Sequence, residues 1–410
     1  MIRDNYLDIS KLTTDSEIMN FFEIINRHGG VLRFVGGAVR DALKGIIGSD
    51  LNLATDLSPE EMVEICTDEG IETVPLGIKQ GSVGIVFGNK IVEVTSLYKY
   101  VFNKDGTKEI EFTDNWEEDA ARRDLTINAV YADEKGNVFD YYNGIEDLEK
   151  GYVRFIGSAE ERIKEDPLRI LRYFRFYSLF GLEEPNKKAI EGCRENATLL
   201  KKVPMERIRD ELLKIIQTPN APRAFNLMQA NAILSSIMPD AEFIDDLTYF
   251  NKIAENTKFE NDALIKMFIL YRPNVSLAEN MAVRLKFNRH DKALFIKLAS
   301  VDCEFENFLD MKTLKKIIYL YGKDFAMAKL LTKATVQRRM SNTLWTIYDQ
   351  INQFSEKEFP LRGKDILDLN MCESEQIGNI LKALEQKWMD SDFALSKEEL
   401  LAQVKTKQVV

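Results

Sequence analysis

The amino-acid sequence predicts an α+β protein, in which a small sheet-containing head is followed by a long helical region. Up to about residue 150, short stretches typical of strands alternate with helical periodicity. Beyond about residue 155 the pattern is almost wholly helical, with breaks at prolines. A chain of 410 residues is also too long for one small core, so we expect two or more domains.

The elements of the head follow one another along the chain. Residues 15–28 predict an amphipathic helix, because isoleucine and phenylalanine recur there at helical spacing. Strand-like and helix-like segments then alternate, and two later strands are separated by a glycine-asparagine turn. We expect a strand, a short helix, a second strand and a hairpin over residues 31–35, 38–44, 49–54 and 81–95.

Composition excludes several kinds of protein. Four scattered cysteines fit neither a disulfide framework nor a zinc site, and two histidines are too few for a histidine-based metal cluster. With no membrane-length apolar run and no secretory signal, we expect a cytoplasmic protein with no membrane and no obligate protein partner. The net charge of −11 means that nucleic acid would be bound only through a local basic surface.

Two glycines, Gly36 and Gly37, directly follow the first expected strand. Glycines let backbone amides approach a triphosphate closely, and the start of the following helix favours anions. Arg40 lies in that helix and is placed to hold a phosphate oxygen. These residues therefore predict a nucleotide-binding turn, although an ordinary tight turn would carry the same glycines.

Oxygen-bearing side chains follow at Asp50, Asn52 and Glu93. Positions 50 and 52 lie two apart on an expected strand, so both side chains point to one face. Such ligands suit a pair of Mg²⁺ ions, which orient a triphosphate and activate an attacking hydroxyl. We predict that Asp50 and Asn52 hold metal and that Glu93 completes the catalytic set. The alternatives are surface polar residues and, for Glu93, an edge strand facing solvent.

A polar cluster follows the sheet-forming segments at Arg122, Arg123, Asp124 and Asn128. Two arginines and an acid suit the triphosphate and the sugar hydroxyls of a nucleotide. We therefore predict that this cluster binds nucleotide. The alternative is an ion pair at the start of a helix.

A charged segment from Glu165 to Arg175 lies on an expected helix whose apolar face is Ile163, Ile170, Phe174 and Tyr177. Aspartate only accepts hydrogen bonds and arginine only donates them. Cytosine and adenine both present an amino donor beside a ring acceptor, so an Asp–Arg pair complements both and mismatches uracil and guanine. The helix would then replace a template, although ordinary ion pairs on a helix face would use the same residues. The predicted nucleotide-binding residues are Glu165, Asp166, Arg169, Arg172 and Arg175.

Taken in order, these motifs resemble bacterial class II CCA-adding enzymes, the tRNA nucleotidyltransferases of the poly(A) polymerase family. Gly-Gly-x-Val-Arg-Asp precedes the acids, and Arg-Arg-Asp-x-Thr-Ile-Asn-Ala and Glu-Asp-Pro-Leu-Arg-x-Leu-Arg follow them. Similar segments at 139–144, 206–212 and 363–378 extend the resemblance over most of the chain.

The resemblance implies a head over residues 1–150, a base-recognising neck over 151–240, and a body and a tail that bind tRNA over 241–350 and 351–410. It implies template-independent addition of C and A to the tRNA 3′ end, from CTP and ATP with Mg²⁺. By position, Asp50 and residue 52 match metal ligands, and Gly37 and Arg40 match triphosphate contacts. The positions that match nucleotide contacts are Arg123, Asp166, Arg169, Arg172 and Arg175.

The chain departs from the family pattern in three places. Asn52 stands where the family has aspartate, and an amide brings no charge and bridges two metal ions poorly. Residues 97–118 lack an arginine-rich loop, and residues 371–375 replace a proline-glycine turn. Two alternatives to CCA addition therefore stay open: an impaired paralogue that binds nucleotide or RNA, and a CC-adding, A-adding or poly(A) polymerase relative.

A basic stretch lies between residues 311 and 340, where Asp324 is the only acid. Given the resemblance, we expect it to contact RNA phosphates, with a solvated helix face as the alternative. The predicted RNA-binding residues are Lys312, Lys315, Lys316, Arg338 and Arg339.

Overall fold

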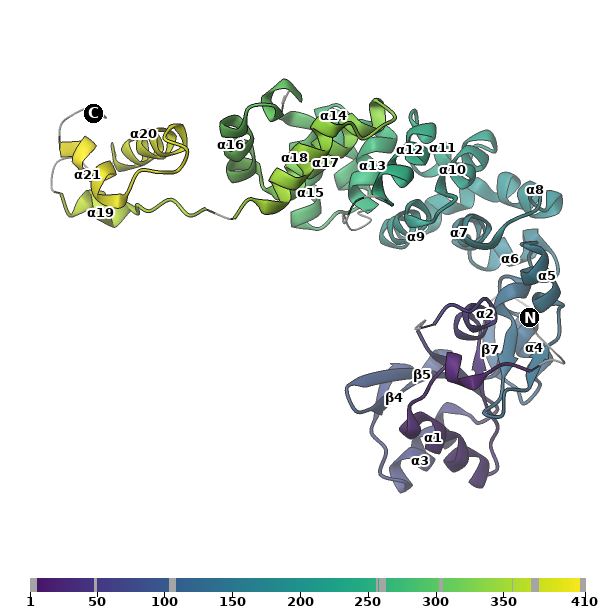
Figure 1. The fold of residues 1–410 in the computed structure, drawn as a ribbon. Coiled ribbons are helices and arrows are strands. Elements are labelled where there is room, and N and C mark those ends of the chain that lie inside the picture. The colour runs from purple at the N-terminus through teal and green to yellow at the C-terminus, as the bar shows by residue number, and fades with distance from the viewer. Residues whose placement is uncertain are drawn as a thin grey trace. The chain divides into compact units, whose positions relative to one another are not determined.

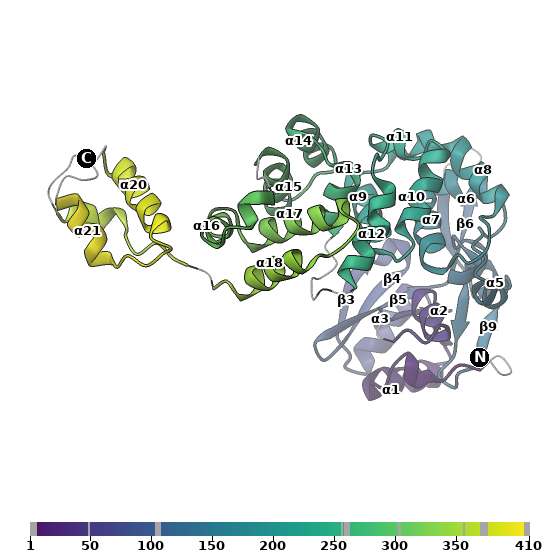
Figure 2. The ribbon, with the colours of Figure 1, turned by 45° about the horizontal axis from the view of Figure 1, so that its top comes forward.

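The computed structural model describes residues 6–47, 50–102, 108–255, 257, 263–301, 305–355, 357–369 and 376–405. The chain divides into two compact units, Met1–Asp240 and Ala241–Val410. All strands of the described residues lie in the first unit (Figures 1 and 2). Within the described residues, no helix has both the length and the apolar character needed to cross a membrane. The finer division into head, neck, body and tail stays a prediction.

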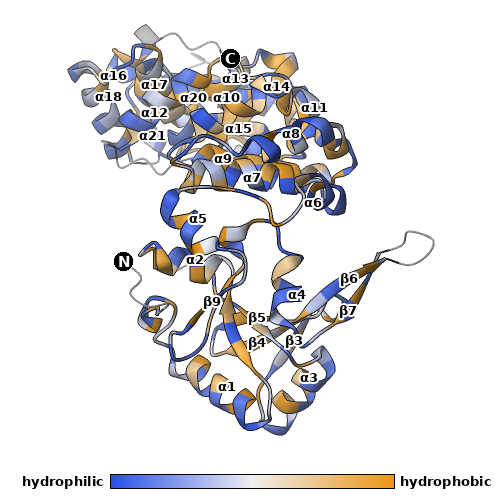
Figure 3. Cartoon of the chain, turned by 90° about the vertical axis from the view of Figure 1, so that its right-hand side faces the viewer, coloured by the Kyte–Doolittle hydropathy of each residue, from blue (hydrophilic) through white to orange (hydrophobic). Residues whose placement is uncertain are grey.

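A mixed seven-stranded sheet forms the centre of the first unit, in the strand order β3-β4-β5-β2-β1-β8-β9. The pairing of β2 with β5 is parallel, and the other neighbours are antiparallel. Its strands are β1 (Leu32–Val35), β2 (Asn52–Thr55), β3 (Thr73–Gly77), β4 (Ser82–Phe87), β5 (Lys90–Ser96), β8 (Val130–Ala132) and β9 (Val138–Asp140). A separate antiparallel ribbon of β6 (Tyr98–Phe102) and β7 (Lys108–Phe112) extends away from this sheet (Figure 3).

Helices α1 (Ser16–Arg27) and α3 (Pro59–Asp68) cover one face of the sheet, and a second, smaller buried cluster that includes Val35 of β1 and Ala120 of α4 (Trp116–Ala121) lies apart from the core that they cover. The buried cluster beneath the sheet joins Phe21 and Phe22 of α1 and Met62 of α3 to Val92 and Val94 of β5. Because successive strand residues alternate between faces, Glu93 points away from this core. The other helices of this part are α2 (Gly37–Leu43) and α5 (Gly144–Lys150).

The remainder of the first unit is helical. It contains α6 (Ala159–Glu165), α7 (Arg169–Phe180), α8 (Lys187–Asn196), α9 (Met205–Gln217), α10 (Ala221–Ala230) and α11 (Leu234–Ile237). Short 3₁₀ helices in the chain are Ile9–Lys11, Ile78–Gln80, Thr126–Asn128, Ala197–Lys202 and Phe305–Phe308. Helix α7 is buried along most of its length and packs against α9 and α10.

The second unit is built around α17 (Lys323–Val336), whose Phe325, Leu330 and Leu331 are fully buried. Helices α12, α15, α16 and α18 pack around it. The unit contains α12 (Ile244–Ala254), α13 (Ala263–Tyr271), α14 (Val275–Arg284), α15 (Arg289–Ser300), α16 (Met311–Tyr321), α18 (Asn342–Gln353), α19 (Gly363–Leu367), α20 (Ile377–Asp390) and α21 (Lys397–Lys405). The last three helices share a small core centred on Trp388 and Leu384.

The expected α+β fold is confirmed, with two local corrections. The strand expected over residues 49–54 begins only at Asn52, so Asp50 precedes it. The single helix expected to carry both Ile163 and Ile170 is two helices, α6 and α7, which break at Asp166. Asp166 has extended dihedral angles, because the residue before a proline is disfavoured in the helical region.

Two other points are decided by the structure. The hairpin of β4 and β5 is confirmed, and β5 is an interior strand between β4 and β2 rather than an edge. The Arg122 motif follows the end of α4 instead of starting a helix. The departure from the family pattern at residues 371–375, and residues 103–107 of the 97–118 segment, lie outside the described residues.

Candidate active site

One cavity of about 770 Å³ in the first unit is lined by all but one of the catalytic, metal-binding and nucleotide-binding residues predicted from the sequence. Those residues are Gly36, Gly37, Arg40, Asp50, Asn52, Glu93, Arg122, Arg123, Asp124, Asn128, Asp166, Arg169, Arg172 and Arg175. The remaining one, Glu165, does not line this cavity. Polar and aromatic residues that sequence reasoning missed also line it, among them Ser82, Thr95, Tyr98, Tyr100 and Arg207.

The oxygen-bearing side chains come from the two parallel strands at the centre of the sheet. Asn52 of β2 and Glu93 of β5 are direct register partners, so they lie side by side on the same face. Asp50 precedes β2 and lines the same cavity. Oxygen donors of this kind fit a hard divalent cation. Among the described residues, no three His, Cys, Asp or Glu side chains cluster as metal ligands, and residue 52 of this set is an amide.

The glycine turn between β1 and α2 brings Arg40 to the cavity. Gly36 has a φ of 70°, a conformation that glycine adopts without strain. Arg40 is buried, and its guanidinium donates to the Asn128 amide oxygen at 2.5 Å and to the Asp41 carboxylate at 2.8 Å. Burial lowers the pKa of Arg40 and the Asp41 charge opposes this, so the guanidinium remains a cation facing the cavity.

Asp124 fixes the helical part of the site to the sheet-containing part. Its carboxylate accepts from the Arg172 Nε at 2.6 Å, from the Asn128 amide at 3.1 Å and from the Leu125 backbone N–H at 2.9 Å. Burial opposes ionisation, but the Arg172 charge and these donors hold the pKa of Asp124 well below its usual range. In this arrangement Asp124 orients Arg172, and its oxygens are already engaged by protein donors.

Asp119, which sequence reasoning missed, holds both arginines of the Arg-Arg-Asp motif. Its fully buried carboxylate pairs with Arg122 at 2.5 Å and with Arg123 at 2.9 Å. It also accepts from the Tyr131 hydroxyl at 2.7 Å. Asp119 lies three and four positions before the arginines on α4, and that helical spacing was the signal that could have identified it.

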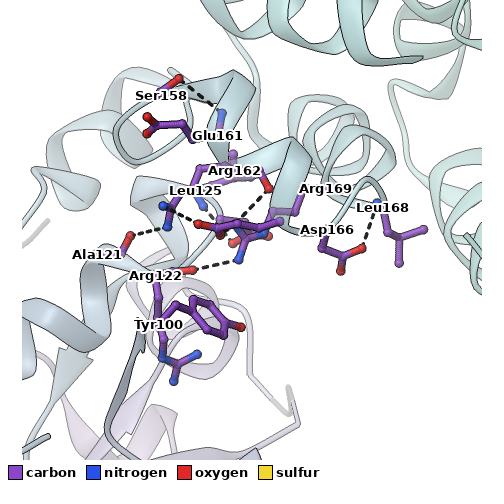
Figure 4. A network of polar contacts seen from close by, with 12 residues as sticks. Tyr100, Ala121, Arg122, Leu125, Ser158, Glu161, Arg162, Asp166, Leu168 and Arg169 are labelled. Carbon is purple, nitrogen blue, oxygen red and sulfur yellow. Dashed lines mark hydrogen bonds and ion pairs between the residues drawn. The ribbon is translucent and has the colours of Figure 1, made fainter. Parts of the chain in front are cut away.

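Asp166 lies between α6 and α7, and Arg169 is the first residue of α7; both line the cavity, one as an acceptor and one as a donor. Figure 4 shows the two side chains. The Asp166 carboxylate accepts from the Leu168 N–H at 3.1 Å and from Arg207 at 2.8 Å. Arg169 donates to the backbone oxygen of Arg122 at 2.9 Å. The orientations of Asp166 and Arg169 are therefore set by other residues and not by a contact between the two.

Glu165 supports Arg169 from behind the cavity. One carboxylate oxygen lies 2.7 Å from Arg169 and the other 2.6 Å from Arg162. The Glu165 side chain is only 8% exposed, so both of its oxygens are committed to these two arginines. Glu165 is thus placed to position Arg169 instead of meeting a ligand directly.

Comparison with known proteins identifies the family. Residues 32–154 match the model for the poly A polymerase head domain, and residues 183–244 match a probable RNA and SrmB-binding site of polymerase A. The chain is 31% identical over 403 residues to the mitochondrial CCA tRNA nucleotidyltransferase 1 of Danio rerio, covering 96% of this chain and 91% of the relative. The chain belongs to the CCA tRNA nucleotidyltransferase family.

Other members of the CCA tRNA nucleotidyltransferase family are also similar over most of their length. The CCA-adding enzyme of Streptococcus uberis is 29% identical over 385 residues, covering 88% of this chain and 89% of that enzyme. The crystal structure of the Bacillus stearothermophilus CCA-adding enzyme in complex with CTP matches with a TM-score of 0.70 and 23% identity, covering 96% of this chain and 98% of that one. That structural match confirms the fold.

The RNA-binding residues predicted for this nucleotidyltransferase lie in the second unit and fall into two groups. Lys315 of α16 pairs with Asp392 at 2.6 Å, and Lys316 pairs with Asp390, so acids distant in the sequence neutralise part of the α16 charge. Lys312 lies on the same helix. Arg338 and Arg339 follow α17 and line a separate cavity.

Proposed function

We propose that the protein adds C and A nucleotides to the 3′ end of tRNA without a template, using CTP, ATP and Mg²⁺. The observation that carries this proposal is the single cavity that joins the oxygen ligands of β2 and β5 to the Asp166–Arg169 segment. In the reaction, the RNA 3′-hydroxyl oxygen bonds to the α-phosphorus and the bond to the bridging oxygen breaks. Pyrophosphate leaves with the electron pair, and the hydroxyl proton passes to water.

The sheet side of the cavity suits the triphosphate. Asp50, Asn52 and Glu93 would hold Mg²⁺, which when bound neutralises phosphate charge and lowers the pKa of the attacking hydroxyl. Arg40 and the Asp119-bound arginines bring positive charge to the same cavity, where it would orient the phosphates.

The helical side suits the base. The Asp166 carboxylate would accept from the amino group of cytosine or adenine, while Arg169 donates to the neighbouring ring acceptor. Uracil and guanine present these groups in reverse, which would leave two charged side chains unpaired. This difference supports CTP and ATP as the substrates.

Asn52→Asp is the first test, on tRNA lacking its last three nucleotides. We expect the parent chain to extend this RNA and the variant to extend it about tenfold faster or more, because a second carboxylate strengthens metal binding. The measurement is primer extension with CTP, with ATP and with both. If only the variant incorporates nucleotide, the parent chain is the impaired paralogue suggested by Asn52, and if neither form does, the proposal fails. Equal rates would show that Asp50 and Glu93 suffice.

Glu165→Gln should weaken base discrimination. Loss of the carboxylate charge releases Arg169 from its 2.7 Å ion pair, so we expect the preference for CTP over UTP in kcat/KM to fall about tenfold. Affinity for tRNA should not change. Glu160→Gln is the matched control, because Glu160 lies on the same helix in an exposed ion pair with Lys164. An unchanged CTP preference would contradict the positioning role of Glu165.

Two further expectations stay predictions. The family relationship supports RNA contacts by the basic residues of the second unit. The cytoplasmic location expected from the sequence stays a prediction, since the Danio rerio relative is described as mitochondrial.

A further inference from the structure

A second cavity, of about 390 Å³, lies in the second unit among α12, the end of α17 and α18. It is lined by three cationic side chains, two aromatic rings and two apolar side chains: Lys252, Arg338, Arg339, Tyr249, Trp345, Ile253 and Met340. No carboxylate is among these described lining residues. Arginines beside aromatic rings are side chains that recognise phosphate and a nucleobase together.

The geometry around Tyr249 shows how these groups combine. The Arg338 guanidinium carbon lies 4.7 Å from the centre of the Tyr249 ring, and the Lys252 ammonium lies 5.8 Å from it. Tyr249 and Trp345 are half-buried, whereas the two arginines are exposed. The rings thus form the inner part of the cavity and the guanidinium groups stand at its rim.

Arg338 occupies a backbone position where glycine is normally found. It follows the C-cap of α17 with a φ of 55°, donating its N–H to the Thr335 oxygen at 2.9 Å. The next N–H, of Arg339, reaches the Ala334 oxygen at 3.1 Å, which completes a Schellman motif. A non-glycine residue in the left-handed region is strained, so a glycine at this position would relieve strain.

We propose that this cavity is a second nucleotide-binding site, in which Arg338 and Arg339 hold a phosphate while the base packs against Tyr249 and Trp345. The cavity volume falls within the usual range of ligand sites. A nucleotide of bound RNA and a free nucleotide share this chemistry. The exposed rim would let an RNA strand enter and leave the cavity. We therefore take a nucleotide of bound RNA as the occupant, an assignment that rests on the proposed function.

Arg338→Gly tests the site, because glycine removes the guanidinium and also relieves the strain. We expect the Kd of the full chain for tRNA to rise about tenfold, and the slope of log Kd against log salt concentration to decrease by about one. The apparent melting temperature should stay the same or rise by about 2 °C, so weaker binding would not reflect unfolding. The measurements are fluorescence anisotropy with labelled tRNA and thermal denaturation.

Lys286→Gly is the matched control. Lys286 also has a positive φ, 50°, at the end of a helix of the same unit, but it lies outside the cavity. It should gain similar stability while tRNA affinity and its salt dependence stay unchanged. If Arg338→Gly leaves tRNA affinity and the salt slope unchanged, or if Lys286→Gly weakens binding equally, the proposal is overturned.

Trp345 fluorescence separates the two sources of nucleotide. The fluorescence change that ligand addition causes in the parent chain but not in Trp345→Phe is assigned to Trp345. A change with tRNA but not with millimolar CTP or ATP supports an RNA nucleotide, and a change with free nucleotide alone overturns RNA as the occupant. These binding readouts require no turnover. Failure of the parent chain to extend RNA would therefore count against the proposed function and not against this site.

Discussion

Asp50→Asn is expected to lower the rate of nucleotide addition by at least about 100-fold, the largest effect on activity that the structure predicts. Asn52 already contributes an amide, so this change would leave Glu93 as the one carboxylate of the three oxygen ligands. A single carboxylate brings less negative charge to a pair of metal ions than two carboxylates do. The rate should be measured by single-turnover extension of truncated tRNA over a range of Mg²⁺ concentrations.

The controls for Asp50→Asn separate chemistry from folding and binding. Its affinity for tRNA should match that of the parent, because Asp50 lines the first-unit cavity and is not one of the predicted RNA-binding residues, which belong to the second unit. Asp68→Asn, an exposed aspartate on α3 of the same unit, should retain full activity. A variant at Asp50 that retains more than about a tenth of the parent rate would remove Asp50 from the proposed metal set.

Asp119→Asn should give the largest loss of stability, about 3 kcal/mol, because it removes the carboxylate shared by two partly buried arginines. The same change should raise the KM for CTP, since Arg122 and Arg123 lose the partner that orients them toward the cavity. Urea denaturation of the full chain and CTP titration measure the two effects. Asp114→Asn, an exposed aspartate just before α4, is the control and should alter neither.

The pH dependence of that stability loss tests its electrostatic origin. Burial opposes ionisation of Asp119, but Arg123 and Arg122 hold its pKa below the ordinary value in the folded protein. Its contribution is therefore complete at neutral pH and is lost only as the pH falls below about 4 toward the folded-state pKa. The stability difference between parent and variant should shrink over that acidic range. A difference independent of pH would point to packing instead of charge.

Local sequence was enough to predict most of the elements that build the site. The helical repeat of α1, the glycine turn before α2 and the turn between β4 and β5 all depend on residues a few positions apart. The motifs could also be identified because each one spans only a few neighbouring residues. Every site residue predicted in the first unit except Glu165 lines one cavity. The family assignment followed from those motifs and is confirmed by the relatives.

The break at Asp166 shows where local patterns mislead. Apolar spacing continues through Ile163 and Ile170 as if in one helix, but Pro167 forces the preceding residue into an extended conformation. That break turns the Asp166 carboxylate toward the Leu168 N–H and Arg207. Periodicity alone therefore identified the residues but not their orientation.

Only the tertiary structure decided which polar groups meet. Asn52 lies opposite Glu93 because β2 and β5, distant in the sequence, pair in parallel. Likewise, Asp124 meets Arg172, and Lys315 meets Asp392, across long stretches of chain. Periodicity within one segment fixes which face of that segment is buried, and so the sequence by itself determined the elements and the candidate residues. Strand register and ion pairs between distant segments depend on how the whole chain folds, and no local pattern encodes that.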